Sequence, residues 1–308
     1  MIEFSVLDDS TRWWNDFERR RRASYTAAGL GAAAAESMLE AARADAGDWT
    51  VAEISDAGTR VGYVAVGVTD ADAAADGTLT GRIGDLHVDA PHAGRDHERA
   101  ARDWAEEWCA RRGASRVAVR LAEPAGELFD DYRVRGQLRA RRVDSPAAPL
   151  DGVTARPMTA AEYPGWLASE KAAYVSDIVR AGALSPEEAV LKSDRDFAEL
   201  VPEGLATPDS AFLVLEAAGE PIGTGWLKHG HLPGVTYGYS LHVHERHRGK
   251  GYGRAAMAAG EQTALAAGDD ALMFTVWGGN EVAMNLYTSA GYRVVEENRS
   301  IDVPRPAS

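Results

Sequence analysis

The sequence predicts an α/β (α+β) protein built from two tandem units, each a mixed sheet flanked by helices. The first observation is size: the chain has 308 residues, 45% of them apolar, which exceeds what one ordinary domain needs for its core. The second observation is an internal repeat. The segment "DLHVDAPHAGRDHERAARDWAEEWCARRGASRVAVR", from Asp85, matches "SLHVHERHRGKGYGRAAMAAGEQTALAAGDDALMFT", from Ser240, at a shift of 155 residues (240 − 85).

The repeat extends in both directions from this segment. Downstream, the same shift holds without a gap until Tyr132 falls on Tyr287 and Gly136 falls on Gly291. Upstream, "VGYVAVGV" pairs with "IGTGWLKH" at a shift of 161, so the hairpin loop of the first half is longer by about six residues. The stretch "VDSPAAPLDGV", with two prolines and small residues, is typical of a linker. We therefore predict two domains, 1–148 and 149–308.

Each half is expected to contain the same elements in the same order: strand, two helices, a hairpin of two strands, a third strand, a long helix, a strand, a short helix and a last strand. In the first half these elements cover about 2–7, 10–28, 31–46, 49–55, 60–69, 81–89, 93–112, 116–121, 124–135 and 137–143. In the second half they cover 153–157, 159–181, 186–199, 211–217, 221–229, 235–244, 251–267, 271–276, 281–290 and 292–302. This order predicts a mixed, mostly antiparallel sheet of six or seven strands with about four helices in each unit.

Two helices carry residues that could suggest a reactive or charged site. Arg19–Arg22 spread around the axis of the helix "STRWWNDFERRRRASYTAAG", which predicts a solvated face. Cys109 lies in "RDWAEEWCARR" beside Trp104 and Trp108, which predicts a small buried side chain. A single cysteine cannot form an intramolecular disulfide.

The charge balance excludes some classes of partner. The chain carries 33 Lys+Arg against 47 Asp+Glu, a formal net charge of −14. Such a surface repels nucleic acid and suits a cationic amine. No stretch approaches the ~18 apolar residues of a membrane helix, and the first residues lack the pattern of a signal peptide. We expect a cytoplasmic protein with no membrane and no nucleic-acid partner.

The stretch "HERHRGKGYGRAAM" predicts an anion site between a strand ending at Val243 and a following helix. Successive glycines let backbone N–H groups converge, a helix N-terminus adds partial positive charge, and the cations add attraction; Gly249, Gly251 and Gly253 alternate here with Arg248 and Lys250. The pattern fits neither a P-loop nor a dinucleotide fingerprint. A pyrophosphate is the ligand we expect.

The residues of this turn resemble the coenzyme A signature of the GNAT superfamily of acyl-CoA-dependent N-acyltransferases, Arg/Gln-x-x-Gly-x-Gly/Ala. Here it reads Arg248-Gly249-Lys250-Gly251-Tyr252-Gly253, between a strand and a helix. Downstream, "NEVAMNLYTSAGYRV" resembles the second family pattern at Asn280, Ala283, Leu286, Tyr287, Gly291 and Tyr292. The resemblance covers about 153–302 directly, and the first half through the repeat.

The resemblance implies acetyl-CoA as the substrate coenzyme and no metal. It implies that main-chain groups near Leu241 or Val243 polarise the acyl carbonyl, that Asn280 contacts the coenzyme, and that Tyr287 is the general acid for the thiolate. The full set of coenzyme-binding residues carried over is Leu241, His242, Val243, Arg248, Gly249, Lys250, Gly251, Tyr252, Gly253, Arg254, Asn280, Ala283 and Tyr287.

The general base is left open by the sequence. Many family members place a Glu or His nine or eleven residues before the motif, where this chain has Tyr239 and Tyr237. A bulge in this strand, common in the family, would turn His242 inward instead. Tyr239, Tyr237 and His242 are thus candidates for base or for substrate-lining residues, and a water relay is equally compatible. Five histidines gather between 229 and 247, but their spacing does not establish a chelating geometry.

The two halves differ where the coenzyme would bind. Arg248, Gly251 and Gly253 become Ala93, Asp96 and Glu98 in the first half, and Asn280 becomes Ala125. Two carboxylates would repel phosphates, so domain 1–148 is predicted not to bind CoA and 149–308 is predicted to be catalytic. The layout resembles two-domain GNAT enzymes similar to mycothiol synthase, in which only the C-terminal unit is active.

We therefore expect an acyltransferase, a GNAT-type N-acetyltransferase, that moves an acetyl group from acetyl-CoA directly to a primary amine of a small-molecule acceptor. The alternative is a non-catalytic acyl-CoA-binding sensor or interaction protein, favoured by the absence of the usual carboxylate base. A homodimer is compatible with either.

Overall fold

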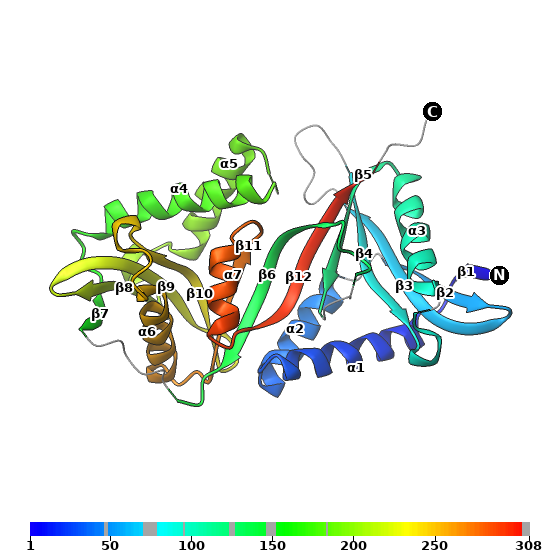
Figure 1. The fold of residues 1–308 in the computed structure, drawn as a ribbon, viewed down its shortest axis with the longest axis horizontal. Coiled ribbons are helices and arrows are strands. Elements are labelled where there is room, and N and C mark those ends of the chain that lie inside the picture. The colour runs from blue at the N-terminus through cyan, green and yellow to red at the C-terminus, as the bar shows by residue number, and fades with distance from the viewer. Residues whose placement is uncertain are drawn as a thin grey trace. The chain divides into compact units, whose positions relative to one another are not determined.

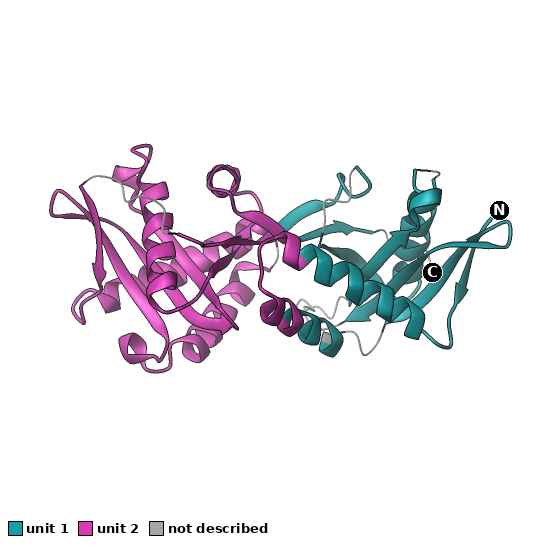
Figure 2. Ribbon diagram, turned by 90° about the horizontal axis from the view of Figure 1, so that it is seen from below, with its two compact units in different colours: residues 1–24, 38–135, 296–308 teal, residues 25–37, 136–295 magenta. Residues whose placement is uncertain are grey.

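The computed structural model describes residues 1–45, 49–69, 79–94, 96–122, 127–145, 152–182 and 184–303, and shows a mixed α/β architecture (Figure 1). The chain forms two compact units that are not continuous in sequence (Figure 2). Unit 1 contains Met1–Ser24, Met38–Arg135 and Glu296–Ser308; unit 2 contains Tyr25–Ser37 and Gly136–Val295. The units therefore differ from a division at 148/149, because the last strand of each half pairs in the sheet of the other half.

The sheet strands of unit 1 lie in the order β1-β2-β3-β4-β5-β12. All described pairs among them are antiparallel except the parallel pair β4 and β5. The elements that lie wholly or partly in unit 1 are β1 (Ile2–Val6), α1 (Thr11–Ala27), α2 (Ala32–Asp45), β2 (Thr50–Asp56), β3 (Thr59–Thr69), β4 (Leu79–Val88), η1 (Ala90–His92), α3 (His97–Ala110), β5 (Ala114–Leu121) and β12 (Arg293–Asp302). Cys109 is fully buried in the core against Gly67, and burial raises the pKa of its thiol to about 12. The prediction for Cys109 is confirmed.

The expectation of a helix at 124–135 is wrong for the described residues 127–135. Residues 127–131 form turns, and the strand β6 (Arg133–Arg142) has already begun at Arg133. The Arg102 guanidinium donates to the Leu128 carbonyl at 2.5 Å and forms a bidentate pair with the Asp131 carboxylate at 2.7 and 2.5 Å. The Leu128 carbonyl thus accepts a hydrogen bond from the Arg102 side chain, whereas in a helix it would accept one from a backbone N–H.

The solvated face expected for Arg19–Arg22 is also wrong in part. Arg20 forms a bidentate ion pair with the buried Asp85 at 3.1 and 2.6 Å. Arg21 is buried and donates to the carbonyl of Arg120 and to Glu296 on β12. The pattern along one helix could not show these partners, which come from distant strands.

The sheet strands of unit 2 lie in the order β6-β11-β10-β9-β8-β7, and the pair β10 and β11 is parallel. In Figure 1, α4 and α5 cover one face of this sheet, and α6 and α7 cover the other. The elements are β6, β7 (Val153–Pro157), α4 (Tyr163–Ala181), α5 (Pro186–Leu200), η2 (Gly204–Ala206), β8 (Ser210–Ala217), β9 (Glu220–Leu232), β10 (Val235–Val243), η3 (Glu245–His247), α6 (Tyr252–Ala266), β11 (Ala271–Trp277) and α7 (Glu281–Ser289).

Each face of the unit 2 sheet has its own apolar core. On the α4 and α5 side, Trp166, Phe197, Phe212 and Trp226 pack together with the ring of Tyr239 at the edge of the cluster. On the α6 side the core is formed by Val143, Leu227, Met257, Leu272, Phe274 and Tyr292. A capping box fixes the start of α5, since Ser185 and Glu188 each bond the other's backbone N–H. The predicted mixed sheet with flanking helices is confirmed.

The strand β6 ties α7 into unit 2 through Arg139. This buried guanidinium donates to the Thr288 hydroxyl at 2.8 Å, to the Tyr292 carbonyl at 3.4 Å and to Gln137 Oε1 at 2.8 Å and 2.6 Å. A strand from the first half of the sequence therefore positions the helix that carries Tyr287.

We expect Arg139→Ala to lower the free energy of unfolding by about 2–4 kcal/mol, because it removes the buried donor to Gln137 Oε1 and to the Tyr292 carbonyl. Arg142→Ala is the matched control on the same strand: its ion pairs with Asp144 and Asp270 are exposed, so a loss below about 1 kcal/mol is expected. Urea denaturation of both variants measures the difference. Equal losses would contradict the anchoring role of Arg139.

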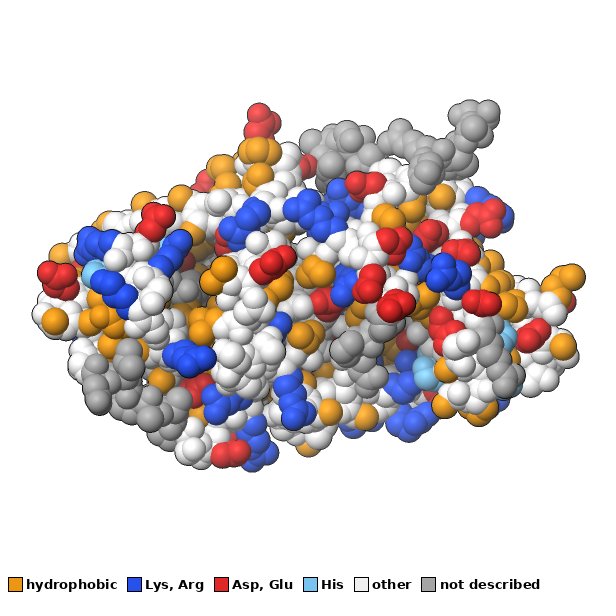
Figure 3. Space-filling model, in the orientation of Figure 1, with side chains coloured by type: hydrophobic (Ala, Val, Ile, Leu, Met, Phe, Trp, Pro, Cys, Tyr) orange, Lys and Arg blue, Asp and Glu red, His pale blue; other side chains and the backbone are white. Residues whose placement is uncertain are grey.

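None of the described helices combines the length and apolar character required to cross a bilayer. On the face shown in Figure 3, acidic and basic side chains are interspersed. The expectations about nucleic acid, membrane and compartment stay predictions.

Candidate functional site

The site begins where β10 and β11 diverge. Their parallel pairing runs from Val235 opposite Ala271 to Gly238 opposite Phe274, and no further pair between them is found among the described residues. Both strands nevertheless continue, β10 to Val243 and β11 to Trp277. The β11-facing backbone groups of residues 239–243 are thus available to an extended polar ligand, as a sheet edge is to an added strand.

A bulge occurs at the same point of β10. Relative to β9, Gly238 lies opposite Leu227 and Ser240 opposite Trp226, which leaves Tyr239 as the extra residue. The bulge predicted from the family resemblance is therefore present. After it, Leu241 packs into the core on the α6 side, whereas the environment of His242 includes Asp177 of α4.

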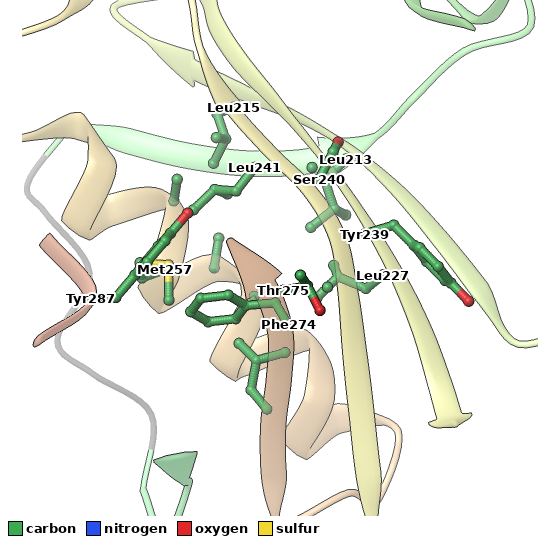
Figure 4. A pocket seen from close by; sticks show the side chains of 16 residues that line it. Leu213, Leu215, Leu227, Tyr239, Ser240, Leu241, Met257, Phe274, Thr275 and Tyr287 are labelled. Carbon is green, nitrogen blue, oxygen red and sulfur yellow. The ribbon is translucent and has the colours of Figure 1, made fainter. Parts of the chain in front are cut away.

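A pocket opens at the divergence and extends between the sheet and α6 (Figure 4). Its walls are mostly apolar, and small residues on β9, β10 and α6 leave the space open. The lining residues are Leu213, Leu215, Gly225, Leu227, Gly238, Tyr239, Ser240, Leu241, Ala256, Met257, Ala259, Gly260, Leu272, Phe274, Thr275 and Tyr287. A mostly apolar pocket with few polar groups is the usual form of a small-molecule site.

The glycine turn follows β10 directly and has the geometry of an anion site. Gly249 and Gly251 have φ values of 76° and 81°, and a Cβ at either position would meet no atom within 4 Å. The backbone N–H groups of residues 249–253 have no acceptor among the described residues. The Arg248 side chain, in contrast, already has a hydrogen-bond partner, because its Nε donates to the Val243 carbonyl at 3.3 Å. Unpaired N–H groups at a helix N-terminus, with two glycines in the left-handed region, fit a pyrophosphate.

Tyr287 on α7 faces the pocket. In Figure 4 its hydroxyl points towards Leu241, and its ring lies 4.3 Å from the ring of Phe274, measured between centroids. Burial raises the pKa of Tyr287 to about 12, and the positive charge of Arg139 acts in the opposite direction. The phenol is therefore protonated at neutral pH and can donate a hydrogen bond into the pocket.

Asn280 and Ala283 lie at the start of α7. The Asn280 side-chain oxygen accepts from the Ala283 N–H at 3.2 Å, so Asn280 is the N-cap of the helix that carries Tyr287. A contact between Asn280 and the coenzyme stays a prediction.

The three candidates for general base have different environments. Tyr237 donates to the Thr275 hydroxyl at 2.8 Å, and burial raises its pKa. Tyr239 stacks on Trp226 at 4.4 Å between centroids, and burial raises its pKa to about 12. Burial and the nearby Arg248 lower the pKa of His242, which favours its neutral form. Only His242 thus has a neutral, basic form at neutral pH.

The histidines between 229 and 247 do not form a metal centre in the described part of the chain, where no cluster of three or more His, Cys, Asp or Glu has suitable geometry. His229 instead lies 2.9 Å from the Thr236 hydroxyl, and the ring of His231 packs on Tyr237.

Sequence reasoning missed the polar side chains that α4 presents towards the site. Glu170, Tyr174 and Asp177 are spaced by four and three residues and therefore share a face of the helix. Burial raises the pKa of all three groups. Asp177 is paired with Arg180 at 2.8 Å, and the Tyr174 hydroxyl donates to Asp196 at 2.8 Å. Their spacing on an otherwise apolar helix face was the available signal.

In the equivalent turn of unit 1, an acidic side chain of the same unit accepts a hydrogen bond from the backbone. Glu98 accepts from the Gly94 N–H at 3.1 Å, so a carboxylate lies against the turn that corresponds to Gly249 of unit 2. Asp96 keeps the left-handed conformation of Gly251, with a φ of 63°. Ala93 ends the short helix η1 in an extended conformation, and Ala125 lies outside the described residues. At Gly94 and Asp96 the unit 1 turn thus has the left-handed conformation of its unit 2 counterpart, while the Glu98 carboxylate occupies a backbone N–H that an anion could bind.

Comparison with known proteins identifies the family of this chain. The sequence profile of the acetyltransferase (GNAT) family matches residues 181–292. The chain is 33% identical over 141 residues to the N-acetyltransferase YycN of Bacillus subtilis, covering 44% of this chain and 90% of that protein. It is 29% identical over 252 residues to the mycothiol acetyltransferase of Streptomyces avermitilis, covering 77% of this chain and 74% of that protein.

Among solved structures, a GCN5-related N-acetyltransferase from Sphaerobacter thermophilus has the same fold over 99% of this chain and 97% of its own, with a TM-score of 0.53 and 19% identity. The internal repeat, the two units with equivalent elements and these similarities agree with one another. The chain belongs to the GNAT acetyltransferase family, in a tandem arrangement.

Proposed function

We propose that unit 2, which contains most of 149–308, transfers an acetyl group from acetyl-CoA directly to a primary amine of a small-molecule acceptor. One observation supports this proposal above all. The edge of β10 that is exposed where β10 and β11 diverge leads, through η3, to the open turn at 249–253. Acetyl-CoA has the matching order of groups, with a thioester, an extended amide-containing arm and a pyrophosphate.

The residues around this path have complementary tasks. The N–H groups of 249–253 bind the pyrophosphate, and Arg248, Lys250 and Arg254 attract its charge. The free edge of β10 at 239–243 pairs with the amides of the extended arm. A main-chain N–H near Leu241 or Val243 polarises the acyl carbonyl, which stabilises the charge that develops on its oxygen.

The acyl carbon is attacked by the neutral amine, so that a C–N bond forms as the C–S bond breaks. The leaving sulfur carries negative charge, and the Tyr287 hydroxyl is the polar group of α7 that lines the pocket at this point. Holding the two reactants together supplies a large part of the rate enhancement. Unit 1, with Glu98 on its own turn, does not bind acetyl-CoA.

Calorimetric titration with acetyl-CoA, followed by a screen of amines, tests the proposal. We expect one site per chain and release of free thiol from acetyl-CoA with at least one amine. The thiol can be followed with a thiol reagent, because the protein's own Cys109 is fully buried. Two sites per chain would contradict the assignment of unit 1, and absence of binding would contradict the coenzyme site.

The same experiment separates catalysis from simple binding. One site per chain without turnover of any amine would favour an acyl-CoA-binding sensor instead. The neutral form of His242 and the carboxyl group of Glu170, both near β10, support catalysis over this alternative.

A further inference from the structure

A group of polar atoms without hydrogen bonds lies on the α4 side of β10, beside the bulge. Trp166 Nε1 and Ser240 Oγ are buried and have no hydrogen-bond partner among the described residues. Glu170, one turn after Trp166 on α4, is half-buried, and its carboxyl group approaches both donors. Polar atoms in this state cost free energy unless a ligand or water completes their hydrogen bonds.

At the corresponding place in unit 1, the indole N–H has a hydrogen-bond partner. Ser240 falls on Asp85 in the repeat, and α1, like α4, has a tryptophan in its first turn, Trp13. Trp13 Nε1 donates to Asp85 Oδ2 at 2.8 Å, and the Arg20 guanidinium pairs with both oxygens of the same carboxylate. In unit 1, an indole N–H, a carboxylate and a cation thus form a hydrogen-bonded network, in which Arg20 Nε alone has no partner among the described residues.

Unit 2 keeps the indole and a carboxylate, but no cation pairs with Glu170 among the described residues. Arg20 lies seven residues after Trp13, and the residue seven after Trp166 is Ala173. The other charged group that acts on Glu170 is Asp177 of the same helix, which is also acidic. The half-buried carboxyl group of Glu170, beside Ser240 of the pocket lining, is suited to a ligand that brings positive charge, whereas Asp177 is already paired with Arg180.

We propose that Glu170 binds the ammonium group of the acceptor in the place that Arg20 fills in unit 1, and then removes its proton as the general base. The inference rests on the proposed function and deepens it, because it names the base and requires an acceptor that is cationic in solution. It also explains how the reaction can proceed although Tyr239 and Tyr237 occupy the positions where many family members have the general base. The carboxylate comes from α4 and reaches β10 at Ser240, next to Leu241.

The proton balance follows from this placement. Glu170 takes one proton from the ammonium group, and the neutral amine attacks the thioester carbon. The C–N bond forms, the C–S bond breaks, and the electron pair leaves with the sulfur. The sulfur takes a proton from Tyr287, which regains one from the nitrogen through solvent. The products are an amide, a free thiol and one proton that Glu170 releases to water.

Glu170→Gln tests the inference, with Glu187→Gln on the exposed first turn of α5 as the matched control. The probes are spermidine, benzylamine and glucosamine, titrated into each protein in the presence of CoA and assayed with acetyl-CoA. We expect Glu170→Gln to lose at least about tenfold in affinity for the amines that bind, and at least about 100-fold in kcat/KM. Affinity for acetyl-CoA should stay unchanged in both variants.

Two further readouts distinguish a base from a structural residue. The acid limb of the kcat/KM profile should lie above the usual range of a glutamate in the wild-type protein and disappear in Glu170→Gln, because burial raises the pKa of Glu170. The unfolding midpoint of Glu170→Gln should equal or exceed that of the wild type at neutral pH, since a half-buried carboxylate without a cation is removed.

The outcomes separate this inference from the proposed function. Coenzyme binding and turnover that are equal in Glu170→Gln and the wild type would overturn the role of Glu170 and leave the acetyltransferase assignment intact. Failure of all three amines to bind the wild-type protein would also count against an ammonium site at Glu170. If the wild-type protein did not bind acetyl-CoA, this result would refute the proposed function instead.

Discussion

Gly251→Asp is expected to abolish binding of acetyl-CoA. The substitution places a carboxylate at the N-terminus of α6, among the unpaired N–H groups that would hold the pyrophosphate. At about 4 Å and an effective dielectric constant of 20, two unit charges repel by about 4 kcal/mol, which corresponds to nearly a thousandfold loss of affinity. Calorimetric titration with acetyl-CoA measures the loss directly.

The fold should tolerate this change, because unit 1 already contains it. Asp96 occupies the equivalent position and adopts a φ of 63°, close to the 81° of Gly251. Gly251→Asn is the matched control: asparagine tolerates the left-handed conformation as well as aspartate does and carries no charge. Gly251→Asn should keep most of the affinity. If Gly251→Asp bound acetyl-CoA as the wild type does, the pyrophosphate would have to bind elsewhere.

The internal repeat and the two motifs predicted most of the fold and the residues along which the coenzyme is proposed to bind. The residues that repeat at a shift of 155 are those that form β10, the turn and α6, so their local pattern predicted their structure. The exchange of β6 and β12 could not be predicted in the same way. Both strands follow the same alternation wherever they pair, and the choice of partner depends on the register with β11 or β5.

The polar partners in the site were harder to predict for the same reason. The sequence predicts a solvated face for Arg20 and Arg21, yet Arg20 pairs with Asp85 and the buried Arg21 donates to the Arg120 carbonyl, two partners that come from distant strands. Glu170 was missed because a single acid on an apolar helix face has no motif. Its significance appears only when Ser240 and Trp166, brought together by packing of α4 on β10, are found without partners. Chemistry that depends on contacts between distant segments is not contained in local spacing.

Tyr287→Phe is expected to lower turnover by about 10- to 1000-fold while affinity for acetyl-CoA stays nearly unchanged. The phenol lines the pocket beside Leu241, and the substitution removes only its hydroxyl. Steady-state kinetics with a saturating amine, together with calorimetry, separates the two effects. The same change at Tyr163 is the control: this half-buried tyrosine belongs to the aromatic cluster on the α4 and α5 side, away from the pocket lining.

The acidity of Tyr287 determines how it acts. Since burial raises its pKa to about 12, complete transfer of its proton to a thiolate whose thiol has a pKa near 8.5 is unfavourable by about 5 kcal/mol. The hydroxyl must therefore stabilise the developing thiolate by a hydrogen bond, and full transfer must be coupled to loss of the proton from the attacking nitrogen. The coupled mechanism makes a sharp kinetic prediction. Thioesters whose thiol has a lower pKa need this hydrogen bond less, so Tyr287→Phe should impair them less than acetyl-CoA. Equal impairment across such a series would show that Tyr287 acts by packing against Phe274 and not by donating to sulfur.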